Sequence, residues 1–398
     1  MPFENRIKHL QGSIRQRGLA GAVLFYSRDI LYYTGTAQPS YLVVLPEDYM
    51  LFVRRGFAFA EKECGLAPGR IAAESRLETV TRRMFPGNGA GQRVGTELDV
   101  LTIAQSFVWQ RALGDRKLVN LSGDILAQRM IKDATEIESL KKSCAAVHAG
   151  HLRIVAQLRA GMSELALSAE IEHAQRLAGH EGAFFMRQHD FVMSRGPLAS
   201  GPNLRRTSGT IYTITGTGLS SAVPAGPSRR IIEAGDLVMV DIPTCVDGYH
   251  ADQSRTYAAG HAPAGAVALY TRLRETADYL IDHLRPGMTT GEAFALALEH
   301  ATALGLEESF LGFEAQAPSH FIGHGVGLEI NEPPLLARNG KEPLMSGMVL
   351  AIELHVMQPG GLTLKLEDTV HLTDDGVELL TVSPRALIVV QGDPGSES

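Results

Sequence analysis

The stretch "VMVDIPTCVDGYHADQSRTY" (residues 238–257) carries two aspartates, Asp241 and Asp252, on either side of a predicted hairpin. Asp247 and the glycine after it suit the two-residue turn of such a hairpin. The pairing that follows places Pro243 opposite Asp252, and Asp241 projects from the same face as Pro243 because side chains alternate along a strand. The two carboxylates are then diagonal neighbours, with β-carbons roughly 5–8 Å apart.

These two aspartates need a partner. Asp241 ends an apolar run, where an unpaired charge is costly to bury. A proton or a cation between the two carboxylates would remove their repulsion. The alternative is structural: one aspartate is exposed and the other forms a salt bridge with Arg255. The pair alone leaves both interpretations open.

A second ribbon repeats the pattern in "VLAIELHVMQPGGLTLKLEDTVHL" (residues 349–372), where Glu353 and Glu367 interrupt apolar runs. A three-residue loop at 359–361 would place Glu353 directly opposite Glu367. This ribbon therefore also carries two carboxylates on one face.

One histidine completes the set. In "SHFIGHGVGLEINEPP" (residues 319–334), His324 lies between two glycines, where little side-chain bulk crowds it. Four carboxylates and one imidazole suit a centre of two cations, with Mn²⁺, Co²⁺, Fe²⁺ or Zn²⁺ preferred over soft metals. Water bridging two such ions ionises near neutral pH.

Length and composition limit the classes of protein. The 398 residues are too many for one ordinary core and predict two domains. The net charge of -7 and the lack of a dense basic run argue against a nucleic-acid partner. The sequence contains no apolar run of about 18 residues, so we expect no membrane span. The three cysteines are far apart and form no CxxC pair, so we expect a reducing, cytoplasmic location.

The pattern of apolar residues divides the chain. Helical and strand-like segments alternate to about residue 120 and predict a small α/β domain, with strands at "RDILYYTG" (28–35) and "SYLVVLPEDYMLFVRRG" (40–56). A long helix follows, capped by Asp133 or by Thr135, the latter with Glu138 in a capping box. We place the boundary near 125–132, which gives domains 1–128 and 129–398. The second domain reads as helices on a curved sheet, so the fold class is α+β.

Five motifs together resemble the creatinase/aminopeptidase P/prolidase family. They are "RMIKDATEI" (129–137), "GDLVMVDI" (235–242), "ADQSRTY" (251–257), "GHGVGLEINEPP" (323–334) and "LEDTVHLT" (366–373). The resemblance covers nearly the whole chain. It implies a creatinase-like N-terminal domain followed by a catalytic domain with the pita-bread fold.

The resemblance also implies roles for individual residues. Asp241 would chelate one metal, His324 and Glu353 the other, and Asp252 and Glu367 would bridge both. The cofactor would be two divalent ions, with Mn²⁺ expected and Co²⁺, Zn²⁺ or Fe²⁺ as alternatives. Glu353 would also accept a proton from the bridging water and return it to the product. His320 would stabilise the negative charge that develops on the substrate oxygen. Alternatively, it would contact a metal ligand and orient it without binding the metal itself.

The chain departs from the family pattern around this centre. The substrate-contacting histidine of the family would fall at Pro224 or Ala225, and a second one at Asn331. Lys365 stands where the family usually has arginine, and His355 replaces part of a Glu-Pro-Gly motif. We therefore predict a reshaped substrate site whose candidate residues are Ala225, Asn331, His355 and Lys365.

The resulting prediction is a metal-dependent exopeptidase of the Xaa-Pro dipeptidase/aminopeptidase P type, with a hydroxide bridging two metals as the nucleophile. Its substrate would be a small peptide or amide, and the resemblance implies a homodimer. Two alternatives stay open. The protein could be a related dinuclear-metal hydrolase of a non-standard amide C–N bond, or an inactive binding homologue.

Overall fold

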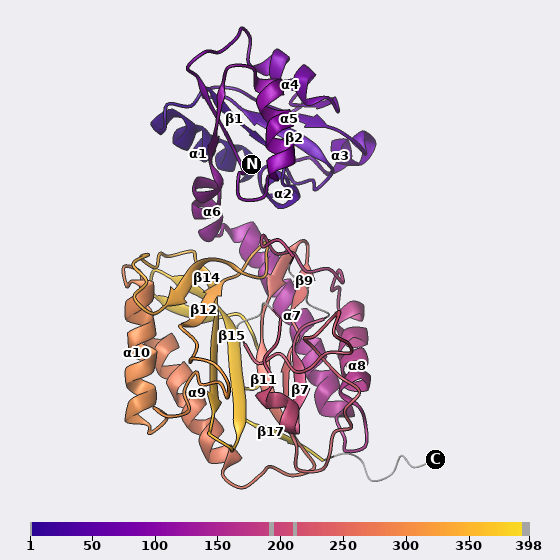
Figure 1. The fold of residues 1–398 in the computed structure, drawn as a ribbon, viewed down its shortest axis with the longest axis vertical. Coiled ribbons are helices and arrows are strands. Elements are labelled where there is room, and N and C mark those ends of the chain that lie inside the picture. Colours follow the sequence, from indigo (N-terminus) through magenta and orange to yellow (C-terminus); the bar gives the residue numbers. More distant parts are fainter. Residues whose placement is uncertain (1, 191–194, 210–212, 392–398) are drawn as a thin grey trace. The chain divides into compact units, whose positions relative to one another are not determined.

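The computed structural model describes residues 2–190, 195–209 and 213–391. The chain forms two compact units. The first contains Met1–Arg129 with Arg187–His189, and the second contains Met130–Met186 with Asp190–Ser398 (Figure 1). Each unit has its own sheets and its own hydrophobic core.

The first unit is built on one mixed sheet with the strand order β4-β3-β2-β1-β5-β6. Its strands are β1 (Gly21–Leu24), β2 (Ser40–Val44), β3 (Tyr49–Val53), β4 (Ile71–Ala73), β5 (Arg93–Thr96) and β6 (Lys117–Asn120). Its helices are α1 (Pro2–Gln16), α2 (Ser27–Thr34), α3 (Phe57–Glu63), α4 (Leu77–Met84), α5 (Ile103–Leu113) and most of α6 (Ser122–Met130). The predicted α/β domain and its β2–β3 hairpin are confirmed.

The strand predicted at residues 28–35 is wrong, because this segment forms α2. Tyrosines and isoleucine favour strands when they are read locally. Here Ile30, Tyr32 and Tyr33 are all buried, so the segment lacks the polar face that normally reveals a helix. Gly35 ends the helix with a φ of 81°, and its N–H donates to Leu31 O.

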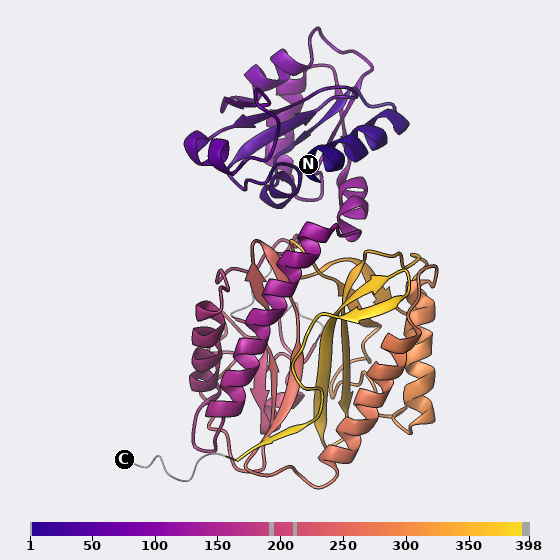
Figure 2. The ribbon, with the colours of Figure 1, turned by 180° about the vertical axis from the view of Figure 1, so that it is seen from behind.

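The second unit begins with a long helix, α7 (Ala134–Gln157), seen most clearly in Figure 2. Asp133 caps it by accepting hydrogen bonds from the N–H groups of Thr135 and Glu136, and the Glu136 carboxylate accepts from the Asp133 N–H. The cap is therefore the first of the two predicted residues. Glu136 rather than Glu138 closes the capping box, since Asp133 lies two positions before Thr135.

Two sheets form the centre of the second unit, with the strand orders β17-β11-β8-β7 and β13-β12-β14-β15-β16. A two-stranded ribbon of β9 and β10 extends beside them. The helices α7 and α8 pack against the first of these sheets, and α9 and α10 against the second (Figure 1). The elements not yet given are α8 (Glu164–Leu177), α9 (Ala266–His283), α10 (Thr290–Ala303), β7 (Leu198–Ser200), β8 (Leu237–Asp241), β9 (Thr244–Val246), β10 (Tyr249–Ala251), β11 (Ser254–Ala259), β12 (Phe321–Gly325), β13 (Glu332–Ala337), β14 (Val349–Met357), β15 (Thr363–Thr373), β16 (Gly376–Leu379) and β17 (Ile388–Val390). The predicted α+β arrangement is confirmed.

Side-chain hydroxyls join the two sheets where β11 meets β15. Thr256 Oγ1 accepts from the N–H of Lys365 at 3.0 Å and donates to its carbonyl at 2.9 Å. Thr369 Oγ1 does the same for Asp252, at 3.0 Å and 2.8 Å. Each hydroxyl is thus the hydrogen-bond partner of a buried backbone N–H and of the carbonyl of the same residue, where no neighbouring strand supplies one. These bonds fix how closely the two sheets approach.

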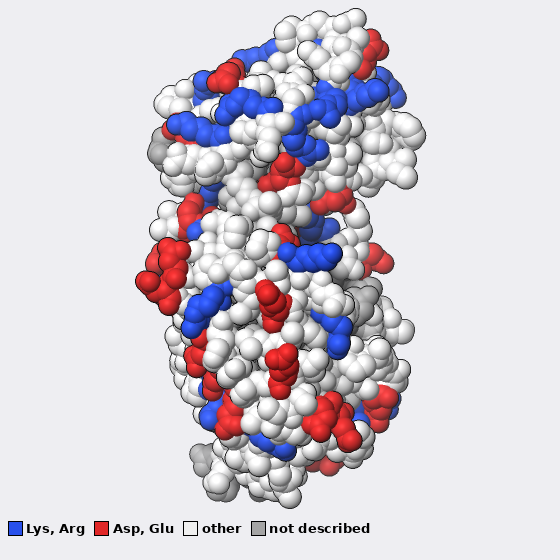
Figure 3. Space-filling view, turned by 90° about the vertical axis from the view of Figure 1, so that its left-hand side faces the viewer, with Lys and Arg blue, Asp and Glu red and all other residues white. Residues whose placement is uncertain are grey.

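The exterior carries charges of both signs. On the face drawn in Figure 3, Lys and Arg predominate over the first unit in the upper part, and acidic and basic side chains are interspersed over the second. Within the described part of the chain, no helix combines the length and apolar character that a membrane span needs.

Candidate metal centre

The two aspartates of the opening stretch lie where the hairpin pattern predicts them. Cys245 pairs with His250 in the β9–β10 ribbon, and the turn residue Asp247 has a φ of 53°. The same register continues beyond the ribbon, because Asp241 on β8 pairs with Ser254 on β11. Asp252 lies between β10 and β11, and both aspartates are buried.

The second carboxylate pair also matches its prediction. Glu353 on β14 and Glu367 on β15 are direct cross-strand partners. The loop between these strands closes with a hydrogen bond from Gln358 N to Leu362 O of 2.9 Å, which leaves residues 359–361 as its tip. The sequence therefore predicted both the partners and the loop.

His324 lies on β12, beside β14, and its backbone pairs with Ala351. The flanking glycines are needed for close approach of the neighbouring strands. A Cβ at Gly323 would lie 2.3 Å from the Ala351 carbonyl oxygen, and a Cβ at Gly325 would lie 2.3 Å from that of Pro333. The glycines thus allow three strands to pack tightly around the imidazole.

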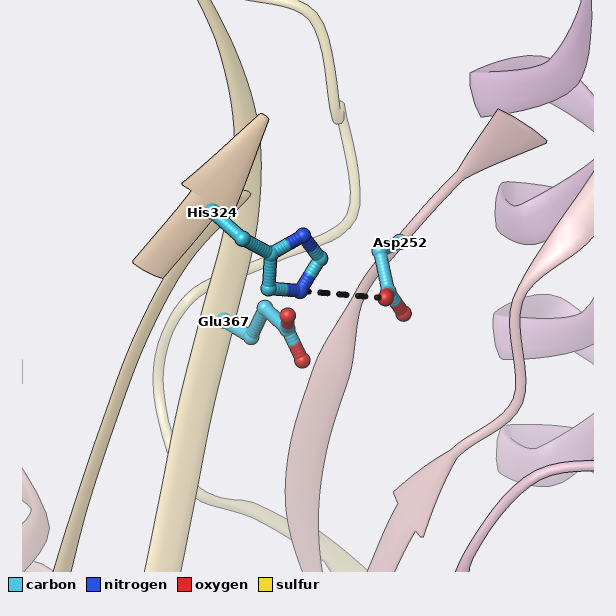
Figure 4. A group of neighbouring side chains, drawn as sticks. All are labelled: Asp252, His324 and Glu367. Carbon is cyan, nitrogen blue, oxygen red and sulfur yellow. Dashed lines mark ion pairs between the residues drawn. The ribbon is translucent and has the colours of Figure 1, made fainter. Parts of the chain in front are cut away.

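Three of these side chains converge in Figure 4: Asp252, His324 and Glu367 each offer a ligand atom within 4.8 Å of the others. His324 Nδ1 donates to the Gly325 carbonyl at 3.0 Å. A carbonyl oxygen can only accept, so Nδ1 is the donor and the other ring nitrogen, Nε2, is the one available to the cluster. It faces Asp252 Oδ2 at 3.9 Å and Glu353 Oε1 at 4.0 Å.

A divalent cation fits this arrangement. Asp252 Oδ1 is buried and has no hydrogen-bond partner among the described residues. His324 Nε2 also faces carboxylate oxygens, at distances longer than a hydrogen bond. Burial and the charge of Asp241 raise the pKa of Asp252 well above its ordinary value. Burial and the charge of Asp252 raise the pKa of Glu367 in the same way. A bound cation would satisfy the oxygens and hold both carboxyls ionised.

Lys365 lies inside the acidic cluster. Its Nζ is 2.6 Å from Asp241 Oδ2, 2.8 Å from Glu353 Oε2 and 3.3 Å from Glu367 Oε2. The three carboxylates raise the pKa of Lys365 well above its ordinary value, although burial alone would lower it. The sequence predicts Lys365 as a substrate residue, whereas the structure places it among the carboxylates. The strand period was the signal for its actual place, because a residue two positions before Glu367 shares its face.

Comparisons with known proteins agree with this geometry. Residues 138–374 match metallopeptidase family M24, and residues 6–131 match the creatinase/prolidase N-terminal domain. The chain belongs to metallopeptidase family M24. The creatinase/aminopeptidase P/prolidase resemblance and the pita-bread fold predicted from the sequence are thereby confirmed.

Relatives of this M24 protein include an uncharacterized peptidase, YqhT, of Bacillus subtilis, 26% identical over 97% of this chain and 100% of the relative. The Xaa-Pro dipeptidase of Pyrococcus furiosus is 28% identical over 65% of each chain. Among solved structures, a Xaa-Pro dipeptidase from Bacillus anthracis superposes with a TM-score of 0.81 at 26% identity, covering 97% of this chain and 99% of that one. Membership of M24 makes the protein a metallohydrolase and implies a centre for divalent metal.

Ser254 contacts a candidate metal ligand of the M24 centre, and sequence reasoning missed this contact. Ser254 Oγ donates to Glu367 Oε2 at 2.8 Å. Arg255 points away from the hairpin aspartates, and its Nη2 pairs with Asp368 Oδ1 at 2.5 Å. The alternative in which Arg255 neutralises one of those aspartates is therefore wrong, because neighbouring residues on β11 face opposite sides.

The remaining predicted site residues of this M24 protein lie in different surroundings. His355 is buried against Phe313, with ring centroids 4.8 Å apart, and its Nε2 donates to Gly312 O at 3.0 Å. Burial and the nearby ammonium of Lys365 lower the pKa of His355 to about 4. His320 and Asn331 are exposed, and Ala225 is buried. Their predicted contacts with substrate stay predictions.

Proposed function

We propose that this M24 protein is a metal-dependent exopeptidase that hydrolyses small peptides of the Xaa-Pro type. The single observation that carries the proposal is the cluster of four carboxylates on two ribbons with the His324 imidazole beside them, all of them buried except the partly buried Glu353. The names of its relatives, which include Xaa-Pro dipeptidases and probable dipeptidases, support the substrate class.

The metal-binding residues would be those of the cluster. Asp252, His324 and Glu367 offer ligand atoms to one ion, and Asp241 and Glu353 complete the set predicted for two. A divalent metal would polarise the scissile carbonyl and lower the pKa of water. Oxygen-rich ligation with one imidazole favours Mn²⁺, with Co²⁺, Zn²⁺ or Fe²⁺ as alternatives.

Glu353 is the proposed general base. Its partial burial would raise its pKa, yet the charge of Lys365 lowers the pKa below its ordinary value and keeps the carboxylate ionised. It can therefore take a proton from the attacking water and return it to the leaving amine. Oε2 accepts from Lys365 at 2.8 Å, which leaves Oε1 on the His324 side to receive the proton.

The substrate contacts are proposed from the resemblance and from position. His320 is exposed and would stabilise charge that develops on the carbonyl oxygen. Asn331 is also exposed and would contact the peptide from the opposite end of β12, next to Glu332, which pairs with Gly325. Ala225 and His355 would shape the site from buried positions. The predicted homodimer and cytoplasmic location come from the resemblance and the cysteine content, and both stay predictions.

The neutral His355 beside the cluster favours a second candidate function. A substrate site with Asn331 and Ala225 where the family has histidines would suit an amide whose amine side is not proline. The same metal chemistry would then cleave a non-standard C–N bond.

A substrate panel tests these functions. Protein stripped of metal and reloaded with Mn²⁺, Co²⁺, Zn²⁺ or Fe²⁺ would be assayed on Xaa-Pro dipeptides, other dipeptides and simple amides, with Glu353→Gln as the control. We expect metal-dependent hydrolysis of Xaa-Pro peptides with kcat/KM below about 10⁵ M⁻¹s⁻¹, near the lower end of the ordinary range for enzymes. Turnover of amides alone would favour the second candidate. Metal-loaded protein that hydrolyses none of them would be a binding homologue.

A further inference from the structure

The Lys365 ammonium is held in a site built for it. It has three N–H donors, and three carboxylate oxygens lie around it at 2.6, 2.8 and 3.3 Å. Its side chain is 1% exposed. Thr256 binds both its backbone N–H and its carbonyl, so the strand that carries the ammonium is fixed as well. This lysine is therefore a fixed part of the cluster.

The ammonium uses oxygens that a metal would need. A transition-metal ion bound by Asp241 and Glu353 would lie about 2.0–2.2 Å from their oxygens. The Nζ of Lys365 is already within 2.8 Å of an oxygen of each residue. Two positive charges cannot share that space without strong repulsion in a site shielded from water.

The other half of the cluster is arranged differently. Lys365 makes its ion pairs with Asp241, Glu353 and Glu367, on one side. On the other side, Asp252 Oδ1 is buried without a hydrogen-bond partner among the described residues. His324 Nε2 faces this side too, 3.9 Å from Asp252 Oδ2. A cation bound at Asp252 and His324 would satisfy this oxygen, which the ammonium does not reach.

We propose that Lys365 supplies one of the two cations of the centre itself, so that the folded protein binds a single divalent ion, at Asp252, His324 and Glu367. The inference deepens the proposed function and rests on its metal site. It replaces the two ions predicted from the family resemblance by one ion and one internal ammonium. Asp241 then serves to hold the lysine.

Counting metal ions in protein and variants tests this proposal without measuring activity. Full-length protein stripped with chelator would be titrated with Mn²⁺, and bound metal would be counted by calorimetry and by elemental analysis. We expect one ion per folded chain in the wild type and two in Lys365→Met, which frees Asp241 and Glu353. Lys132→Met is the matched control, because Lys132 is also 1% exposed and pairs with Glu332 at 3.4 Å outside the cluster. It should bind one ion.

The possible outcomes separate the proposal from the proposed function. Two ions in the wild type, or one ion in a folded Lys365→Met, would overturn the internal-cation proposal and leave the peptidase proposal standing. No bound metal at all would overturn both. One ion in a wild type that hydrolyses no peptide would support the ion count and refute the peptidase.

A second measurement keeps the test decisive should Lys365→Met fail to fold. Anomalous scattering from crystals of the Mn²⁺-loaded wild type would locate every bound ion. We expect one peak, near Asp252 and His324, with Lys365 Nζ still in hydrogen-bonding contact with Asp241. Two peaks, or a lysine displaced from Asp241, would refute the proposal.

Discussion

His355 and Lys365 are direct cross-strand partners on β14 and β15, so a buried imidazole lies opposite a buried ammonium. The imidazole remains uncharged at neutral pH, because burial and the ammonium hold its pKa at about 4. It acts as a hydrogen-bond donor to Gly312 and as a flat surface against Phe313. His355 therefore helps to hold β14 in place beside the cluster and does not exchange protons there.

The first prediction concerns this histidine. His355→Ala leaves the Gly312 carbonyl without its donor and removes the ring that packs on Phe313. We expect a loss of about 1–3 kcal/mol in the free energy of unfolding, the usual cost of an unsatisfied buried group. We also expect kcat/KM to fall by up to about 10²-fold through misplacement of the cluster. Urea unfolding and steady-state kinetics measure the two effects. An unchanged kcat/KM would remove His355 from the site.

Replacing the proposed general base gives the second prediction. Glu353→Gln keeps an oxygen that can accept from Lys365, so the fold should persist, but the side chain can no longer take a proton. We expect kcat to fall by about 10²–10⁴-fold. Steady-state kinetics, with bound metal counted in parallel, distinguishes a lost base from a lost ion. Near-wild-type turnover would assign the proton transfer to another group.

The third prediction tests the hydroxyl bridges between the sheets. Thr256→Val and Thr369→Val each leave a buried backbone N–H and carbonyl without partners. We expect each to lower the free energy of unfolding by about 1–3 kcal/mol. Thr271→Val is the matched control, since that hydroxyl only donates to Val267 O within the exposed face of α9. If all three variants unfold at the same urea concentration, the bridges do not contribute.

The fourth prediction concerns pH and the first unit. Burial and the nearby charge of Asp29 raise the pKa of Glu97 from 4.5 to about 8. The folded state then holds a proton that the unfolded chain releases, so stability should be full below about pH 4.5 and decrease as pH rises to about 8. Glu97→Gln should flatten this dependence, and its amide oxygen can still accept from the N–H groups of Phe25 and Tyr26.

Fluorescence of the single tryptophan, Trp109, follows this transition, because the residue is buried in the core of the first unit. Unfolding midpoints would be recorded from pH 5 to pH 8.5 for the wild type, for Glu97→Gln and for the exposed control Glu78→Gln. We expect the control to behave as the wild type does. A Glu97→Gln profile parallel to the wild type would contradict the assignment.

Local rules of strand geometry explain why the positions of the candidate metal ligands could be predicted. The turn at Asp247 and the loop at 359–361 fix two registers, and alternation then places Asp241, Asp252, Glu353 and Glu367 on facing surfaces. Alternation also placed Lys365 on that face, but only the structure shows which oxygens surround its ammonium. Helix α2 was not predicted because both of its faces are buried. Its sequence therefore lacks the periodic change between apolar and polar residues that indicates a helix.

The cluster also joins the two sheets of the second unit. Asp241 is the last residue of β8 and Asp252 lies just before β11, whereas His324, Glu353 and Glu367 belong to the sheet of β12, β14 and β15. An ion held by residues from both sides is thermodynamically linked to folding. Free metal at a hundred times its dissociation constant would add about 2.7 kcal/mol to the stability of the folded chain. The supply of metal in the cell would then set how long the second unit survives proteolysis, independently of whether any peptide is being cleaved.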